Sequence, residues 1–317
     1  MDFLAAIFIT PFATMAENPE FVLEVVIGGL LTGVMYALVA LGFVLIYKAS
    51  GIFNFAQGVM VLFAALCFVG QIQLGMPTLL SLLSTILIMI ALAFGIERVV
   101  LRPLVNQEPI ILFMATIGIT FFLTGFGQLV WGGDIKVLDI GIPKDPIMVG
   151  SSLIAGGVLI NEFDLVAAAV AGLLVAVLGI FFQKTTVGRA LRAVADDHQA
   201  AQSVGIPLKT IWVIVWSVSG FVGLAAGIMW GSNLGVQFSL ALVALKALPV
   251  LILGGLTSIP GAIVGGLIVG TGEKVAEVFW GPAFGGAIED WFAYVLALVF
   301  LLVRPQGLFG ERIIERI

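Results

Sequence analysis

The chain has 317 residues, of which 61% are hydrophobic and only 10% charged, and its formal net charge is −5 at pH 7. A soluble domain carries roughly 25% charged residues, so this composition excludes an ordinary water-soluble fold. With one histidine and one cysteine (Cys67), the chain can form neither an internal disulfide nor a metal site built from histidines and cysteines.

The first 20 residues contain an apolar stretch that is interrupted by Pro11. They lack the basic start of a secretory signal, and the stretch is shorter than the roughly 20 residues of a membrane-spanning helix. We therefore expect this segment to lie at the membrane interface and to lead into the first span.

Apolar runs of spanning length follow along the rest of the chain. Since about 20 residues cross the ~30 Å hydrocarbon core as a helix, these runs predict an all-α, polytopic transmembrane helix bundle. The chain forms one membrane domain, residues 1–317, with a best estimate of about nine spans. The predicted spans are residues 21–47, 55–73, 78–96, 110–130, 164–183, 210–231, 238–255, 260–276 and 289–303.

A polar turn, YKASGIFNFAQGVMVLF, joins the first two spans and places Asn54 and Gln57 between Gly51 and Gly58. Amides inside a bilayer are costly unless they are paired or line a water-filled path. Flanking glycines permit the broken helix with which membrane proteins expose backbone to a polar solute. Asn54, Gln57 and Gly58 therefore either line a translocation pathway or form an ordinary cytoplasmic turn beside Lys48.

Two later segments carry further expectations. Residues 131–163 form the longest outer loop, which is too short for a domain and is expected to be a periplasmic cap or docking surface. Lys246 lies inside an apolar run, where it either belongs to the translocation pathway or extends its ammonium group to the nearer interface. Residues 232–277 could form a re-entrant pair instead of two crossings, so eight to ten spans are possible.

The distribution of lysine and arginine sets the orientation, because cytoplasmic loops of membrane proteins are enriched in both. With the C-terminus in the cytoplasm, ten of the fourteen basic residues fall on that side and the outer loops are acidic. The ten are Lys48, Arg98, Arg102, Lys184, Arg189, Arg192, Lys209, Arg304, Arg312 and Arg316.

Glycines recur within the predicted spans at a spacing of four residues, which places them on one helix face. Small residues on one face let helix backbones approach closely in a membrane. The spaced sets are Gly29 and Gly33; Gly223, Gly227 and Gly231; Gly261 and Gly265; and Gly266 and Gly270. They predict a tight multi-helix bundle.

Residues 184–209, KTTVGRALRAVADDHQAAQSVGIPLK, form a polar island between two long apolar runs. Good helix formers predict one short helix over about residues 190–204, with Gly205 as its C-cap and Pro207 beyond it. A loop of this kind at the membrane face indicates contact with something in the cytoplasm.

The charges of this predicted helix run against its dipole. Arg189 and Arg192 lie near its start and Asp196 and Asp197 in its middle, whereas the helix dipole favours acids first and bases last. The helix is therefore either shaped for a partner or for lipid phosphates, or simply a solvated cytoplasmic helix. Elsewhere the sequence has no HExxH, GxSxG or phosphate-loop motif and no nucleophile–base constellation, which argues against an enzyme.

The polar loop resembles the coupling loop of bacterial ATP-binding cassette importer permeases. Its run QAAQSVG resembles their Glu-Ala-Ala-x-x-x-Gly signature, with Gln199 in place of the glutamate, as is usual in permeases of the branched-chain amino acid type. Similar segments follow in order along nearly the whole chain: 29–58, 97–104, 115–118, 187–197, 245–266 and 304–311. Val59 stands where many relatives carry a glutamate, so a charge-based role for that position has no support.

The resemblance implies a permease subunit of the bacterial inner membrane that imports branched-chain or other amino acids by alternating access. The implied partners are a second homologous permease subunit, two cytoplasmic ATPase subunits, a periplasmic substrate-binding protein and membrane lipid, without nucleic acid. ATP would be bound by the partners, so no cofactor is expected in this chain. The implied ATPase-coupling residues are Gly188, Arg189, Arg192, Asp196, Ala200, Ala201 and Gly205.

Three alternatives remain open. The same class of transporter could carry urea or short amides, because the named pathway residues are mostly neutral amides. An ATP-independent channel or carrier would need ionisable groups within the membrane, and only Lys246 qualifies. A structural or assembly subunit is the third alternative.

Overall fold

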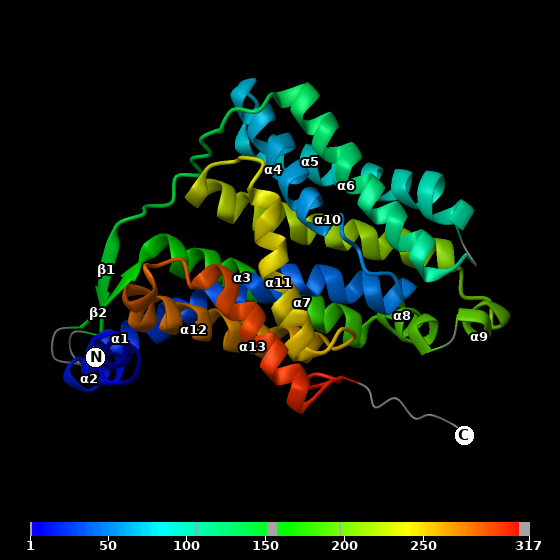
Figure 1. Cartoon of the computed structure of the whole chain (residues 1–317). Coiled ribbons are helices and arrows are strands. Elements are labelled where there is room, and N and C mark those ends of the chain that lie inside the picture. Colours follow the sequence, from blue (N-terminus) through cyan, green and yellow to red (C-terminus); the bar gives the residue numbers. More distant parts are fainter. Residues whose placement is uncertain (1, 105–106, 151–156, 197, 311–317) are drawn as a thin grey trace.

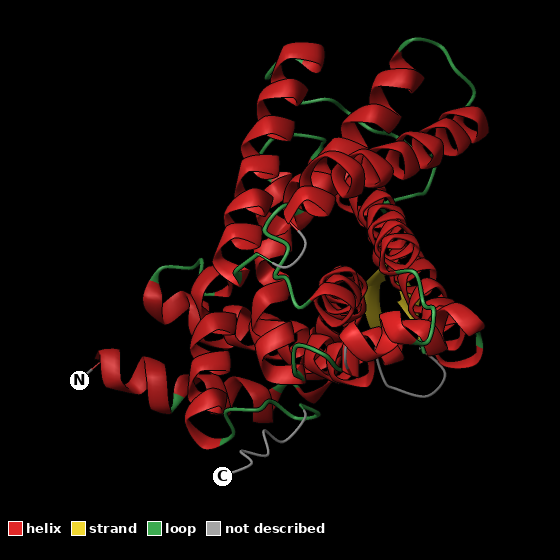
Figure 2. Ribbon diagram, turned by 90° about the vertical axis from the view of Figure 1, so that its right-hand side faces the viewer, coloured by secondary structure: helices red, strands yellow, loops and turns green. Residues whose placement is uncertain are grey.

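The computed structural model describes residues 2–104, 107–150, 157–196 and 198–310 (Figure 1). Helix predominates, and two short strands form one hairpin (Figure 2). The elements are α1 (Asp2–Phe8), α2 (Thr10–Glu17), α3 (Pro19–Ser50), α4 (Gln57–Gln73), α5 (Thr78–Gly95), a π-helical turn (Ile96–Leu101), a 3-10 turn (Arg102–Leu104), α6 (Pro109–Trp131), β1 (Pro146–Val149), β2 (Val158–Asn161), α7 (Glu162–Lys184), α8 (Thr186–Asp196), α9 (His198–Ser203), α10 (Leu208–Leu234), α11 (Leu240–Gly254), α12 (Ile259–Phe284) and α13 (Glu289–Val303).

A helix occupies each predicted span, which confirms the all-α membrane bundle. Within the described part of the chain, five helical segments are long and apolar enough to cross a bilayer: Pro19–Ser50, Thr78–Leu104, Ile110–Trp131, Glu162–Lys184 and Leu208–Leu234. The pair α11 and α12 passes the same test together but bends by 115°, as a broken span or a re-entrant loop would. The number of crossings therefore stays a prediction, and this bend lies within residues 232–277, where a re-entrant pair was the alternative to two crossings.

Helix α3 is the centre of the bundle and α12 lies along it (Figure 1). The two backbones meet at glycines: a Cβ on Gly33 would lie 2.6 Å from the carbonyl oxygen of Gly266. A Cβ on Gly270 would lie 2.5 Å from the backbone nitrogen of Gly33. Only hydrogen fits at such distances, so the four-residue glycine spacing does produce close helix contact.

A second group of helices, α4, α5, α6 and α10, packs on the other side of α3 (Figure 1). Gly227 of α10 brings that helix against α4, since its Cβ would lie 2.6 Å from the carbonyl oxygen of Val61. Helix α11 crosses between the two groups and contacts α4 as well as α3 and α12. Helix α11 therefore contacts helices of both groups, as α3 does.

One end of the bundle, here called the hairpin end, carries β1, β2 and the N-terminal helices (Figure 1). The strands are antiparallel, and the segment before them joins the connection between α10 and α11 through a bridge between Lys136 and Val236. The expected interfacial lead-in is two short helices, α1 and α2, which pack against α12: the Trp280 indole nitrogen donates to the Ile7 carbonyl oxygen at 3.1 Å.

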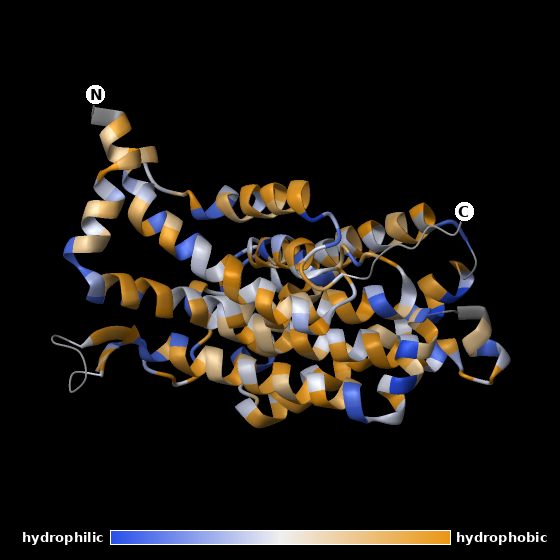
Figure 3. Ribbon diagram, turned by 90° about the horizontal axis from the view of Figure 1, so that it is seen from below, coloured by the Kyte–Doolittle hydropathy of each residue, from blue (hydrophilic) through white to orange (hydrophobic). Residues whose placement is uncertain are grey.

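The opposite end, here called the α8 end, carries α8, α9 and residues 304–310. Leu308 donates its backbone N–H to the Leu253 carbonyl oxygen at 2.8 Å, which places the segment after α13 beside the end of α11. Hydrophilic residues gather toward the two ends of the bundle, while apolar residues predominate along the helices between them (Figure 3).

The prediction of a single helix over residues 190–204 is wrong in its start and in its extent. Helix α8 begins at Thr186 because Thr185 is its N-cap: the Thr185 hydroxyl oxygen accepts from the Gly188 N–H at 3.2 Å. A second helical segment, α9, follows from His198, and residue 197 lies outside the described residues. The predicted end is confirmed, since Gly205 has a φ of +85° two residues after the last residue of α9.

Candidate functional site

A non-helical segment, residues 51–56, separates α3 from α4 and is largely buried. Gly51 ends α3 in the left-handed conformation with a φ of +66°. Gln57 then begins α4 next to Gly42, which lies eight residues before the end of α3. At a rise of about 1.5 Å per residue, α4 therefore starts roughly 12 Å inside the bundle, measured from the end of α3. The predicted helix break is confirmed, and it is an internal feature rather than a turn at the surface.

Asn54 and Gln57 are both buried and belong to one hydrogen-bond network. The Asn54 amide nitrogen donates to the Gln57 side-chain oxygen at 3.4 Å, and its own oxygen accepts from the Ala56 N–H at 3.0 Å. The Ser219 hydroxyl of α10 donates to the same Gln57 oxygen at 2.5 Å. A Cβ at Gly42 would lie 2.6 Å from the Gln57 amide nitrogen, so the glycine makes room for this side chain.

Gly58 lies at the edge of an apolar cavity of about 320 Å³ between the helix break, α6 and α11. A Cβ on Gly58 would lie 2.2 Å from the carbonyl oxygen of Ala241, so α4 and α11 touch through backbone here. Three aromatic rings line the cavity: Phe43, Phe53 and Phe55. The volume lies at the lower end of the range of about 300–1,000 Å³ that small-molecule pockets occupy.

Lys246 lies on another side of α11 and does not extend freely to an interface. Its ammonium nitrogen is 2.9 Å from a carboxylate oxygen of Glu273 on α12. Asp290 and Glu289, at the start of α13, approach the same nitrogen at 3.4 and 3.8 Å. The Tyr36 hydroxyl of α3 donates to the same oxygen of Glu273 at 3.0 Å. Lys246 therefore joins α11 to α12 and α13 through ion pairs.

Sequence reasoning had missed Glu273, Tyr36 and Ser219. Glu273 lies between Gly272 and Lys274 within a predicted apolar span, and a carboxylate at that depth signals a partner. The pairing itself joins residues on different helices, so no spacing in the sequence identifies it. Ser219 is a serine in an apolar helix. Many helices contain such a serine, so it does not by itself indicate a functional role.

At the α8 end, α8 is anchored tightly on the end of α7. A Cβ on Gly188 would lie 1.9 Å from the Phe182 carbonyl oxygen. The Arg192 guanidinium donates to that oxygen at 2.7 Å and to the Gln183 carbonyl oxygen at 3.4 Å. Arg192 thus satisfies the last carbonyls of α7, where a cation also suits the helix dipole.

The other proposed coupling residues divide by exposure. Gly188 and Ala201 are buried and serve packing within the chain. Arg189, Asp196, Ala200 and Gly205 are exposed at the surface. One side of α8 and α9 therefore holds the loop on the bundle, and the other side is open to a partner.

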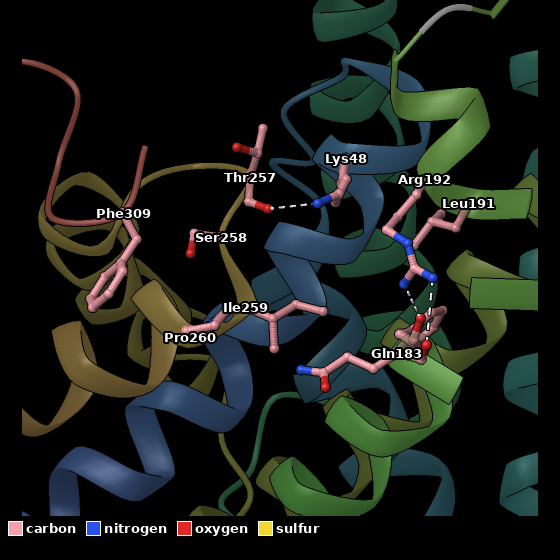
Figure 4. Close-up of a pocket in the computed structure, with 10 residues that line it drawn as sticks. Lys48, Gln183, Leu191, Arg192, Thr257, Ser258, Ile259, Pro260 and Phe309 are labelled. Carbon is pink, nitrogen blue, oxygen red and sulfur yellow. Dashed lines mark hydrogen bonds between the residues drawn. The ribbon is translucent and has the colours of Figure 1, made fainter. Parts of the chain in front are cut away.

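A further cavity of about 220 Å³ lies where α8 meets α3 and the start of α12 (Figure 4). Lys48 of α3 donates to the Thr257 carbonyl oxygen at 3.4 Å, and Arg192 also lines the cavity. The Ser258 hydroxyl caps α12 by accepting from the Gly261 N–H at 3.0 Å. Both cations are bound to carbonyl oxygens: Lys48 joins α3 to the turn before α12, and Arg192 joins α8 to α7.

Among the residues that the structure describes, no group of three histidine, cysteine, aspartate or glutamate side chains could hold a metal ion. The sequence also gave no cofactor motif, and the absence of a cofactor stays a prediction.

Comparison with known proteins gives a consistent family assignment. Residues 25–304 match the family described as branched-chain amino acid transport system, permease component. The high-affinity branched-chain amino acid transport system permease protein BraD of Pseudomonas aeruginosa is 29% identical over 93% of this chain and 98% of its own length. The high-affinity branched-chain amino acid permease protein LivH of Escherichia coli K12 is 27% identical over 96% of this chain and 100% of its own length. A probable branched-chain amino acid permease protein LivH of Methanocaldococcus jannaschii is 29% identical over 89% of this chain and 91% of its own length.

Proposed function

Because the chain belongs to the family of branched-chain amino acid transport permease components, we propose that it is the permease subunit of an ATP-binding cassette importer for these amino acids. The observation that carries the proposal is the family match, which spans the helix bundle and the α8–α9 segment together. The proposed complex contains a second homologous permease subunit, two cytoplasmic ATPases and a periplasmic binding protein.

The α8 end is proposed to face the cytoplasm. Lys48, Arg192 and residues 304–310 all lie at this end, as the distribution of basic residues had predicted. Grouping of lysine and arginine on one side of the bundle supports a cytoplasmic location. The hairpin end, with β1 and β2, would then face the periplasm and the substrate-binding protein.

The ATPases are proposed to dock on the exposed side of α8 and α9, which includes Arg189 and Asp196. Motion of α8 would pass to α7 through Gly188 and Arg192, because these residues fix α8 to the last carbonyls of α7. Rigid-body transfer of this kind could switch the bundle between outward-open and inward-open arrangements. Alternating access is the mechanism that we infer from it.

The translocation pathway is proposed to follow α11. The aromatic cavity beside Gly58 lies on one side of this helix, and the ion pairs of Lys246 lie on another. An apolar cavity of about 320 Å³ suits a branched aliphatic side chain. Asn54 and Gln57 do not line that cavity; they are neighbours in sequence of Phe53, Phe55 and Gly58, which do, and their network holds the broken helix in place.

The proposal is tested by uptake into proteoliposomes that contain the chain with its partner subunits. Loaded binding protein and internal ATP should give accumulation of radiolabelled L-leucine, with competition by isoleucine and valine. Uptake of urea or acetamide instead would favour the amide alternative. Flux through this chain alone, without ATP, would contradict an ATP-driven permease and favour a carrier or channel.

A further inference from the structure

A polar cavity of about 310 Å³ lies between α3, α7, α10, α11, α12 and α13, toward the hairpin end. Glu273 and Tyr36 line it and are both buried. Asn233, at the end of α10, also lines the cavity and is exposed. The cavity therefore leads from the surface to a buried carboxylate. Glu273 lies eleven residues before the end of α12, which corresponds to a depth of roughly 16 Å along the helix.

Glu273 has an unsatisfied oxygen at this depth. The residue is 3% exposed, and its Oε1 atom takes both described contacts, from Lys246 and from Tyr36. Its Oε2 atom is buried and has no hydrogen-bond partner among the described residues. Buried polar atoms are nearly always paired, and an exception calls for an explanation such as a binding role. A carboxylate oxygen is best satisfied by a cationic donor.

The other charges around the cavity match a ligand that carries both signs. Besides Tyr36, five acidic or basic side chains line it: Asp164, Lys246, Glu273, Lys274 and Glu289. Three are acidic and two are basic, so the lining has a formal charge of −1 when all five are ionised. A neutral solute such as urea offers no charge to these groups or to the unpaired Glu273 oxygen, whereas a zwitterion offers one group to each sign.

We propose that this cavity is a binding subsite for the charged backbone of an α-amino acid. The ammonium group donates to the free oxygen of Glu273, and the carboxylate faces Lys246 and Lys274. This inference rests on the proposed function and names the part of the substrate that the permease recognises. Selection for α-amino acids is then made in this chain as well as in the binding protein.

The test compares L-leucine with N-acetyl-L-leucine, which keeps the carboxylate and the side chain but has no ammonium charge. Binding is measured by saturation-transfer NMR titration of the assembled transporter in nanodiscs, without binding protein. Wild type should bind L-leucine at least about tenfold more tightly, because acetylation removes a charge-assisted hydrogen bond. Equal binding of the two ligands would overturn the subsite, and this comparison needs no variant.

The variant Glu273→Gln should lower L-leucine binding by about tenfold or more and should remove the preference over N-acetyl-L-leucine. A loss caused only by altered packing would weaken both ligands alike, and would overturn the proposal. Glu277→Gln is the matched control: Glu277 lies one turn further along α12, does not line the cavity, and accepts from the Ala287 and Glu289 N–H groups. It should keep the wild-type preference.

ATP-dependent uptake of L-leucine by the same wild-type complex distinguishes failure of the proposed importer function from failure of the proposed Glu273 subsite. Absence of uptake would overturn the proposed function and, with it, this inference. Uptake together with an unchanged ligand preference in Glu273→Gln would overturn the subsite alone.

Discussion

The contact between α8 and α7 offers the sharpest prediction about coupling. In Gly188→Ala, the new methyl carbon would lie 1.9 Å from the Phe182 carbonyl oxygen, whereas ordinary contact begins at 3.4 Å. Helix α8 must therefore move away from α7 by about 1.5 Å, the difference between these distances. Overpacking costs about 1–3 kcal/mol. The same movement weakens the bonds from Arg192 to the end of α7, each worth about 1.5–3 kcal/mol.

The expected result is uncoupling of ATP hydrolysis from transport. The assay measures L-leucine uptake and ATP hydrolysis in the same proteoliposomes and reports their ratio. Gly188→Ala should lower this ratio by about tenfold or more, since a change of 1.4 kcal/mol in a coupling equilibrium is already tenfold.

The matched control is Gly179→Ala. Gly179 lies in α7, its added Cβ would meet no atom within 4 Å, and alanine favours a helix. This variant should couple as wild type does. A normal ratio in Gly188→Ala would refute the argument that the α7–α8 contact transmits motion.

Three further substitutions, two beside the proposed pathway and one at the end of α5, test buried contacts by thermal unfolding of the purified chain. Gly58→Ala would place a Cβ 2.2 Å from a carbonyl oxygen of α11, so the melting temperature should fall by the equivalent of about 1–3 kcal/mol and uptake should be lost. Ser219→Ala removes the hydroxyl that donates to Gln57 and should cost about 1 kcal/mol, and an unchanged melting temperature would speak against the network. Arg102→Ala leaves the buried carboxylate of Glu97 without its partner at 2.9 Å and should cost about 3 kcal/mol, the lower end for buried pairs because Arg102 is 37% exposed. Adding Glu97→Gln to that variant should recover part of the loss.

Much of the fold could be predicted because membrane spans have a composition and a length that sequence alone reveals. The glycine spacing at Gly29 and Gly33 correctly predicted close helix contact, since a helix places residues four apart on one face. The start of α8 was not predicted, because the capping role of Thr185 depends on one side-chain hydrogen bond. The bend of 115° between α11 and α12 was anticipated only as an alternative.

The candidate site was predictable in part. Asn54, Gln57 and Lys246 were identified because polar groups within apolar runs are costly and need partners. Their partners were not identified: Ser219 and Glu273 lie on other helices, and only the packing of α10 and α12 brings them close. Arg192 was expected at a partner surface, but its guanidinium binds carbonyls of its own chain. The sequence shows neither how exposed such a side chain is nor which groups of its own chain it binds; both follow only from the three-dimensional structure.

The account depends most directly on the claim that the α8–α9 segment faces the cytoplasm and carries the ATPases. Cys67 is buried and is the chain's only cysteine, so a Cys67→Ala background permits specific labelling at one introduced cysteine. Val204, which is 75% exposed just after α9, suits this label, and Leu159 on β2 is the control at the hairpin end.

The measurement is labelling with a membrane-impermeant maleimide in sealed vesicles of known orientation. The account predicts that Val204→Cys is labelled only in inside-out vesicles and is protected when the ATPases are bound. Leu159→Cys should be labelled only in right-side-out vesicles, with no effect of the ATPases. Labelling of Val204→Cys from the outside, or labelling that the ATPases leave unchanged, would contradict the account.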